Sequence, residues 1–287
     1  MTDVTDLIKL IALKEINPTQ FEGYSKTVGS PNVFGGQVLA QALNAALRTI
    51  TNKRVLHSMH SYFLEAGDLE RPIIYTVNIT RDGGSFSVRR VTAEQNGVTI
   101  FILSASFQNQ EEGHNHQISM DAHVKQPEEL MSWTEILEQF GDMIPKKMKG
   151  FLEVERPVEF KPVQIVNPLN TEDLPATTNV WFKLNGDAST LDLGMKQQIL
   201  TYVSDYNILG TAMNRHASKA HWGNTQTASL DHSMWYFRDF DFDDWMLYAM
   251  ETPNASSARG LATGNIFTRD GVLIASVAQE GLMRPKS

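Results

Sequence analysis

The sequence contains an internal duplication, and this feature limits the possible folds more than any other. Four short motifs recur in the same order at offsets of about 170 to 175 residues, and each is weak alone. They are His57-Ser-Met59 with His232-Ser-Met234, Ser87-Val-Arg89 with Ser257-Ala-Arg259, Asn96-Gly-Val98 with Asp270-Gly-Val272, and Ser106-Phe-Gln108 with Ser276-Val-Ala-Gln279. Four ordered matches at nearly one offset indicate two copies of one structural unit.

Each copy is predicted to contain a strand, a helix and four antiparallel strands. The helices are predicted at Phe34–Leu47, which is rich in Ala and Leu, and at Gln198–Leu209, which is apolar or aromatic at almost every position. Asn96-Gly97 and Asp270-Gly271 are dipeptides typical of hairpin turns. The strands are predicted at Gln20–Thr27, Val55–Phe63, Pro72–Thr80, Ser85–Gln95 and Val98–Gln108, then at Val158–Val166, Asn179–Leu184, Thr225–Phe237, Trp245–Thr252, Ser256–Thr268 and Val272–Met283.

Neither predicted helix has a wide polar face. A helix that is apolar nearly all round must be buried, and a strongly twisted sheet is the available cover. We therefore predict an α+β protein in which a curved antiparallel sheet wraps around a central helix, twice, with the two sheets packed or joined edge to edge. The predicted domains are residues 1–112 and 151–287, connected by a linker with short helices over residues 113–150.

The overall composition excludes several classes of function. A net charge of −8 and a pI near 5.5 argue against nucleic acid as the main partner. The absence of cysteine excludes disulfides, thiolate–zinc sites and cysteine nucleophiles. Neither an apolar run of the roughly 20 residues that span a membrane nor a basic N-terminal signal is present, so we expect a cytoplasmic protein with no membrane partner. A Gly-x-Ser-x-Gly elbow, a P-loop and a dinucleotide fingerprint are also missing.

Asp205 is the first candidate functional residue. It lies in the second predicted central helix, among apolar neighbours, and no Lys or Arg lies within one turn to pair with it. A carboxylate partly removed from water costs stability unless it is hydrogen-bonded or paired, so such a residue is a candidate for function. The alternative is that Asp205 faces solvent along one wet edge of the helix, and the helix alone does not separate the two readings.

Ser229 and Gln279 are further polar candidates in the second copy. Thr227, Ser229, Asp231 and Ser233 alternate along one predicted strand and form a polar stripe on one face. Gln279 alternates with apolar residues on the last strand and therefore points with the apolar set. An ordinary strand hydroxyl and a buried structural amide are the alternative interpretations.

Histidine spacing does not favour a metal site. On a strand, His57 and His60 would point to opposite faces, which suits one metal ion poorly. His114 and His116 lie in a polar linker. We therefore predict no metal and interpret these histidines as hydrogen-bonded or solvated.

Five segments closely resemble the acyl-CoA thioesterase II family. The likeness runs in order from near the N-terminus to Arg284, and Asp-His-Ser-Met-Trp is its most specific part. The segments are Phe34-Gly-Gly-Gln-Val38, His57-Ser-x-His-Ser-Tyr-Phe63, Leu230-Asp-His-Ser-Met-Trp235, Ser256-Ser-Ala-Arg-Gly260 and Gln279-Glu-Gly-x-Met-Arg284.

The resemblance implies a double hotdog fold and hydrolysis of acyl-CoA to free CoA and a carboxylic acid, with no metal or cofactor. The family's catalytic acid lies in the second central helix, and the matching residue is Asp205. Its hydroxyl residue, Thr or Ser, stands two places before the Asp-His-Ser-Met-Trp motif, which is Ser229, and its glutamine precedes Glu-Gly, which is Gln279. Hotdog proteins usually associate through their sheets, so a homodimer or homotetramer is expected.

Our hypothesis is direct attack by a water molecule that Asp205 activates and that Ser229 and Gln279 hold in position. Backbone N–H groups at a helix start are natural donors to an oxyanion, and Gly35 and Gly36 are candidates for this role. A covalent Ser229 mechanism is less favoured, because no His lies on its predicted strand face.

Two alternatives stay open. A hotdog enoyl-CoA hydratase would want Asp and His together on the central helix, and Gln198–Leu209 contains no His. A non-catalytic acyl-CoA-binding protein would not need the three site residues. Arg81, Arg89, Arg90 and Arg259 are possible partners of the CoA phosphates, although most are expected to be solvated or structural.

Overall fold

The computed structural model describes residues 1–287 except 52, 145, 166–171 and 287. Helices and strands of the first half are α1 (Val4–Ile11), β1 (Lys14–Asn17), β2 (Gln20–Gly23), α2 (Gly35–Leu47), β3 (Val55–Phe63), β4 (Ile73–Asp82), β5 (Phe86–Gln95) and β6 (Val98–Gln108). The connecting segment contains η1 (Pro127–Glu129), α3 (Trp133–Phe140) and α4 (Lys146–Leu152). The second half contains β7 (Val158–Pro162), β8 (Thr177–Leu184), α5 (Leu193–Ser204), α6 (Ile208–Met213), η2 (Asn214–His216), β9 (Thr225–Ser229), β10 (Asp231–Tyr236), β11 (Met246–Ser256), β12 (Arg259–Thr268) and β13 (Leu273–Pro285).

The described strands form one 13-stranded sheet that is symmetric about its centre. Its order is β1-β2-β4-β5-β6-β3-β10-β13-β12-β11-β8-β7, with β9 also paired to β13. Reading outwards from β3 and from β10, the strands of the two halves follow in equivalent order. At the junction Met59 lies opposite Met234, and these residues belong to matching motifs of the duplication. The predicted two sheets are therefore joined edge to edge.

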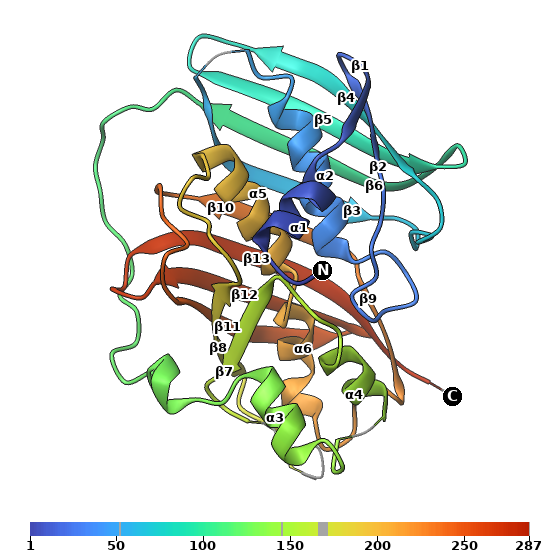
Figure 1. Cartoon of the computed structure of the whole chain (residues 1–287), viewed down its shortest axis with the longest axis vertical. Coiled ribbons are helices and arrows are strands. Elements are labelled where there is room, and N and C mark those ends of the chain that lie inside the picture. Colours follow the sequence, from blue (N-terminus) through green and yellow to red (C-terminus); the bar gives the residue numbers. More distant parts are fainter. Residues whose placement is uncertain (52, 145, 166–171, 287) are drawn as a thin grey trace.

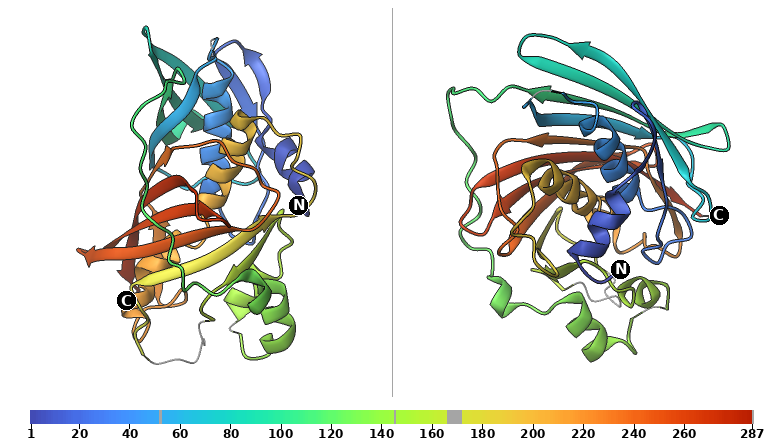
Figure 2. Two further views of the ribbon diagram at one scale, coloured as in Figure 1. Left: turned by 90° about the vertical axis from the view of Figure 1, so that its left-hand side faces the viewer. Right: turned by 45° about the horizontal axis from the view of Figure 1, so that its top comes forward.

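The central helices α2 and α5 lie next to each other on the inner side of the curved sheet (Figures 1 and 2). They run antiparallel: Gly36 at the start of α2 contacts Asp205 at the end of α5, and Asn44 donates a hydrogen bond to Gln198 over 2.7 Å. Both helices are buried on nearly every side, as their composition predicted. The α+β double hotdog fold is therefore confirmed.

Close approach of α2 and α5 depends on Gly36. A Cβ atom at this position would lie 2.4 Å from the carbonyl oxygen of Tyr202 and 2.5 Å from Cε1 of Phe34. Those distances are too short for any side chain, so only glycine lets the start of α2 reach the end of α5.

Two predicted elements are interrupted, one at Asn207, two residues after Asp205, and the other at Leu230, directly after Ser229. The helix predicted at Gln198–Leu209 ends before Asp205, and α6 begins at Ile208, because Asn207 adopts a left-handed conformation with φ of 68°. The strand predicted at Thr225–Phe237 divides at Leu230 into β9 and β10. The strand predicted at Val158–Val166 ends at Pro162, and Val166 lies outside the described residues.

Within the described part of the chain, helices are too short or too polar to cross a membrane.

Candidate active site

Asp205 lies immediately after the last residue of α5. The residue as a whole is partly exposed, but its Oδ1 atom is shielded from solvent and has no hydrogen-bond partner among the described residues. Its Oδ2 atom accepts a hydrogen bond from the backbone N–H of Gly36 over 2.8 Å. The expectation that this carboxylate is partly removed from water is therefore confirmed, and the solvated alternative is wrong.

The position of Gly36 explains how a carboxylate is tolerated here. Unpaired N–H groups and the helix dipole make the N-terminus of a helix favourable for an anion, and α2 points its N-terminus at Asp205. Gly35 is also closely surrounded, because a Cβ atom there would lie 2.7 Å from Oδ2 of Asp205. The two halves of the chain therefore meet at this carboxylate.

Gln279 and Ser229 are hydrogen-bonded to each other. Gln279, on β13, is buried, and its Nε2 atom donates to Oγ of Ser229 over 3.0 Å. Ser229 is the last residue of β9, which pairs with β13 so that Ser229 lies opposite Gly281. The break at Leu230 lets β9 and β10 follow different parts of β13, which brings Ser229 to the side chain of Gln279.

His232 is a site residue that the sequence analysis missed. It lies on β10, is completely buried, and bonds through both ring nitrogens: Nδ1 is 2.5 Å from Oε1 of Gln279 and Nε2 is 2.9 Å from Oγ of Ser204. Ser204 directly precedes Asp205. The available signal was the presence of His232 inside the most specific motif, but strand alternation assigned it to the apolar face.

The protonation of Asp205 reflects this environment. Burial raises the pKa of the Asp205 carboxyl above its ordinary value, whereas His232, the Gly36 N–H and the Gln279 side chain act in the opposite direction. Burial likewise lowers the pKa of His232, and the neighbouring Asp205 opposes this effect. A carboxylate with a raised pKa is a stronger base than an ordinary one, which suits it to accept a proton.

The arginines considered as partners of the CoA phosphates differ in their exposure to solvent. Arg89 is 1% exposed and bonds Thr49 and Asp82, so the structure excludes it as a phosphate ligand. Arg259 is exposed and bonds Glu280 over 3.0 Å. Arg81 and Arg90 are exposed.

His57 and His60, one of the two histidine pairs considered for a metal site, bond serine hydroxyl groups. Nε2 of His57 is 2.8 Å from Oγ of Ser106, and Nδ1 of His60 is 3.1 Å from Oγ of Ser233. Their expected placement on opposite faces is wrong, because β3 has an irregularity between Leu56 and Ser58. Burial lowers the pKa of His57, and the charge of His60 lowers it further.

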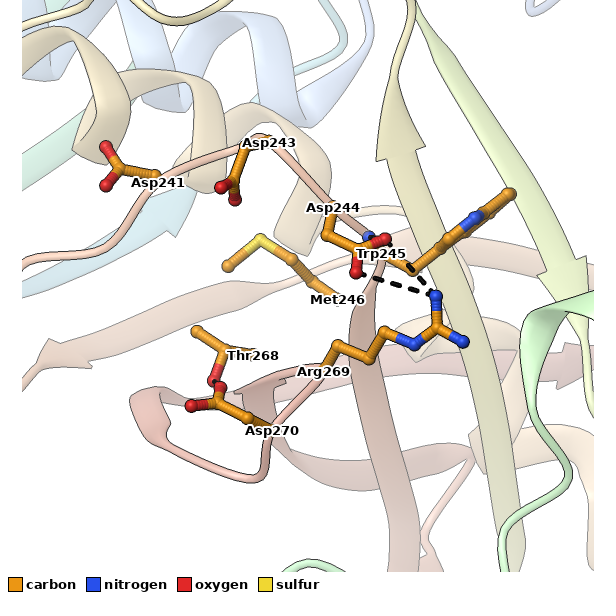
Figure 3. A pocket seen from close by; sticks show the side chains of 8 residues that line it. All are labelled: Asp241, Asp243, Asp244, Trp245, Met246, Thr268, Arg269 and Asp270. Carbon is orange, nitrogen blue, oxygen red and sulfur yellow. Dashed lines mark hydrogen bonds and ion pairs between the residues drawn. The ribbon is translucent and has the colours of Figure 1, made fainter.

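A surface hollow of about 450 Å³ lies between the segments around Asp244 and Arg269 (Figure 3). Its lining contains several aspartates and Arg269, whose guanidinium is 3.5 Å from Asp244. None of the predicted site residues lines it. The hollow therefore has no part in the chemistry considered below.

Comparison with known proteins covers both halves of the chain. Residues 22–108 match the acyl-CoA thioesterase N-terminal domain and residues 148–282 match acyl-CoA thioesterase. Acyl-CoA thioesterase 2 of Haemophilus influenzae is 41% identical over 285 residues, covering 99% of each chain. Human acyl-coenzyme A thioesterase 8 is 37% identical, covering 96% of this chain and 88% of its own length.

A solved structure agrees with these sequence matches. The acyl-CoA thioesterase II TesB2 from Mycobacterium marinum superimposes with a TM-score of 0.79 at 34% identity, covering 97% of this chain and 98% of its own. The likeness extends over both halves and the segment between them, and so over every residue of the Asp205 network. The chain belongs to the acyl-CoA thioesterase family, whose members are hydrolases.

Proposed function

We propose that the protein hydrolyses acyl-CoA thioesters to free CoA and a carboxylic acid by direct attack of water, with Asp205 as the base. The observation that carries this proposal is the asymmetric environment of the Asp205 carboxylate: Oδ2 is held by the Gly36 N–H, whereas Oδ1 is shielded and has no partner among the described residues. One oxygen is therefore fixed, and the other is available to accept a proton. Partial exposure of the residue supports access for a substrate.

The proposed reaction has two steps. Oδ1 of Asp205 accepts a proton from water as the water oxygen bonds to the thioester carbonyl carbon, which gives a tetrahedral intermediate with a negatively charged oxygen. The intermediate then re-forms its carbonyl group, the carbon–sulfur bond breaks, and the CoA thiolate takes up a proton from Asp205 or solvent. General-base help of this kind contributes about 10²–10⁴-fold.

Ser229 and Gln279 hold the attacking water in this scheme. The Gln279 amide has two N–H donors, of which one is directed at Ser229, and its effect on the Asp205 carboxyl supports a position beside the base. The Ser229 hydroxyl can both accept from the amide and donate to water. Gly36 already donates its N–H to Asp205, so Gly35 is the remaining candidate of the predicted pair for the oxyanion.

The alternatives receive less support from the site. An enoyl-CoA hydratase would want a histidine beside the Asp on the central helix, but His232 comes from β10 and both its nitrogens already have partners. A binding protein without activity would have no use for a shielded carboxylate that raises the free energy of the fold. An enoyl-CoA that is hydrated without release of thiol would favour the hydratase, and binding without turnover would favour the binding protein.

The decisive experiment measures thiol release from saturated acyl-CoAs of increasing chain length. We expect free CoA from the wild type and a loss of about 10²–10⁴-fold in kcat for Asp205→Asn, which keeps the size of the side chain but cannot accept the proton. Asp187→Asn is the matched control, because Asp187 is exposed and should leave kcat unchanged. A folded Asp205→Asn protein with the wild-type rate would remove Asp205 as the base.

The assembly and compartment stay predictions. We expect a homodimer or homotetramer, which light scattering on a size-exclusion column measures, and a cytoplasmic location, which cell fractionation measures. Preference among acyl chains follows from the same chain-length series.

A further inference from the structure

We propose that His232 is a positioning residue for hydrolysis: its Nδ1–H group fixes the orientation of the Gln279 amide. This inference rests on the proposed function, because it assigns the reason for which Gln279 presents N–H groups to Ser229 and to the attacking water. His232 acts through Gln279 and does not itself contact the substrate in this scheme.

The geometry holds the imidazole ring at both ends. Nε2 lies 2.9 Å from Oγ of Ser204, at the end of α5, and Nδ1 lies 2.5 Å from Oε1 of Gln279, on β13. The backbone is held as well, since Ser61 on β3 donates to the carbonyl oxygen of His232 over 2.8 Å. A completely buried ring that is bonded to a helix and a strand, on a backbone held by a second strand, has little freedom to rotate.

Proton accounting determines which nitrogen is protonated. In the structure Oε1 of Gln279 faces Nδ1 of His232, and because an amide carbonyl oxygen can only accept, Nδ1 carries the hydrogen in this orientation. The neutral ring then accepts at Nε2 from the Ser204 hydroxyl. If the ring were charged, Nε2 would donate to Ser204, and the Ser204 hydroxyl would donate to the carbonyl oxygen of Thr201, 2.8 Å away. In both states Nδ1–H donates to Gln279.

This bond decides which end of the amide faces the base. The oxygen and nitrogen ends of an amide are nearly equal in shape, so packing alone does not choose between them. With Nδ1–H of His232 bonded to Oε1, the NH2 group of Gln279 is directed at Ser229. The Gln279 side chain also acts to lower the pKa of the Asp205 carboxyl. A reversed amide would present its oxygen to Ser229 and remove the donors from the water site.

The adjacent residue strengthens the same attachment. Oδ1 of Asp231 accepts a hydrogen bond from the backbone N–H of Glu280 over 2.7 Å. Two successive residues of β10 therefore hold two successive residues of β13, one through the backbone and one through the side chain. Asp205 and Asp231 are the charged groups that act on the ring. Burial lowers the pKa of His232, whereas these two carboxylates act to raise it.

Kinetics of paired variants test the positioning role. His232→Leu removes the donor, and His232→Asn keeps an N–H near the position of Nδ1. In the wild-type background we expect His232→Leu to lower kcat about 10-fold with KM changed less than about 3-fold, and His232→Asn to restore part of the rate. In a Gln279→Ala background neither change should lower kcat further, because the residue on which His232 acts is absent.

A milder variant covers the case in which His232→Leu does not fold. Ser204→Ala removes only the hydroxyl that bonds Nε2, and we expect a smaller fall in kcat that also disappears in the Gln279→Ala background. Thermal unfolding establishes that each variant is folded. Equal losses in both backgrounds would overturn the inference, because they would show that His232 acts on stability or packing independently of Gln279.

The tautomer of His232 gives a test that needs no activity. In a long-range 1H–15N spectrum of the full chain with labelled histidine, the signal that is lost in His232→Asn identifies the residue. We expect a proton on Nδ1, in a neutral or charged ring. A neutral ring protonated only on Nε2 would overturn the inference, whereas absence of thiol release from the wild type would overturn only the proposed function.

Discussion

The carboxylate of Asp205 accepts a hydrogen bond of 2.8 Å from the N–H of Gly36, although the two residues are 169 positions apart and belong to different copies of the duplicated unit. The end of one central helix thus meets the start of the other. The second copy supplies Asp205, Ser229, His232 and Gln279, and the first supplies the N–H that holds the carboxylate. Neither copy alone would build this site.

Asp205→Asn is expected to make the protein more stable at neutral pH. Burial raises the folded-state pKa of Asp205 above its ordinary value of 3.8, so the folded state favours the protonated form and the ionised carboxylate destabilises it. The advantage of the variant should be present above the raised pKa and should shrink as the pH falls through that pKa towards 3.8. Melting temperatures of both proteins over this range measure the effect; a lower melting temperature for Asp205→Asn at pH 7 would contradict it.

Activity is expected to depend on ionisation of the same carboxyl. Because the base must be deprotonated, kcat/KM should fall as the pH decreases through the pKa of Asp205, and the midpoint should lie above 3.8. A pH–rate profile of thiol release, at pH values where the fold is intact, locates this midpoint. The residual rate of Asp205→Asn should lack the acid limb, and the same limb in that variant would assign it to another group.

Gly36→Ala is expected to damage both the fold and the rate. The added Cβ would lie 2.4 Å from the Tyr202 carbonyl oxygen, so α2 and α5 must move apart, at a cost of roughly 1–3 kcal/mol. The same movement lengthens the bond to Asp205, so kcat should fall as well. Gly84→Ala is the control, since nothing lies within 4 Å of a Cβ built there. Equal melting temperatures for the two variants would show that the contact is not restrictive.

Much of the fold could be predicted from the sequence because its determinants are local or repeated. The strands at Val55–Phe63 and Val98–Gln108 have the predicted bounds, since alternating residues and the Asn96-Gly97 turn define them. The duplication predicted two equivalent sheets, packed or joined edge to edge, and the structure joins them edge to edge at β3 and β10. Periodicity alone did not reveal the breaks at Asn207 and Leu230, because each depends on tertiary contacts that favour a turn over one more residue of helix or strand.

The site was predictable only in part. Asp205 was marked by the absence of a nearby cation. Strand alternation marked Ser229 and Gln279, the resemblance gave them a role, and the structure places them in direct contact. His232 escaped because a histidine on an inward strand face is indistinguishable, in sequence, from one that only fills the core. Its partner Ser204 lies on another element, so no spacing rule connects them.

Arg89→Ala is expected to destabilise the fold without a direct effect on catalysis. The guanidinium is 1% exposed, donates to the Oγ1 atom of Thr49 over 2.8 Å and pairs with Asp82 over 2.9 Å, so it joins the end of α2 to β4. Loss of these bonds should cost roughly 1–3 kcal/mol in the free energy of unfolding. Arg90 is exposed, so Arg90→Ala should change the free energy of unfolding by less than about 0.5 kcal/mol. Urea unfolding measures both; a raised KM in a stable Arg89→Ala protein would instead indicate a role in binding.

Ser229 separates water attack from a covalent mechanism. Its hydroxyl accepts the Nε2–H of Gln279 over 3.0 Å, so Ser229→Ala leaves that donor without its partner and should lower kcat about 10-fold. Ser229→Thr keeps the hydroxyl and should stay within about 3-fold of the wild type, whereas Thr227→Ala, two places earlier on β9, should have no effect. Thiol release measures the rates, and mass spectrometry of rapidly quenched reactions measures the protein. We expect no acyl adduct, because water and not the Ser229 oxygen attacks the thioester; a transient adduct on Ser229, lost in Ser229→Ala with all activity, would replace the water mechanism by a covalent one.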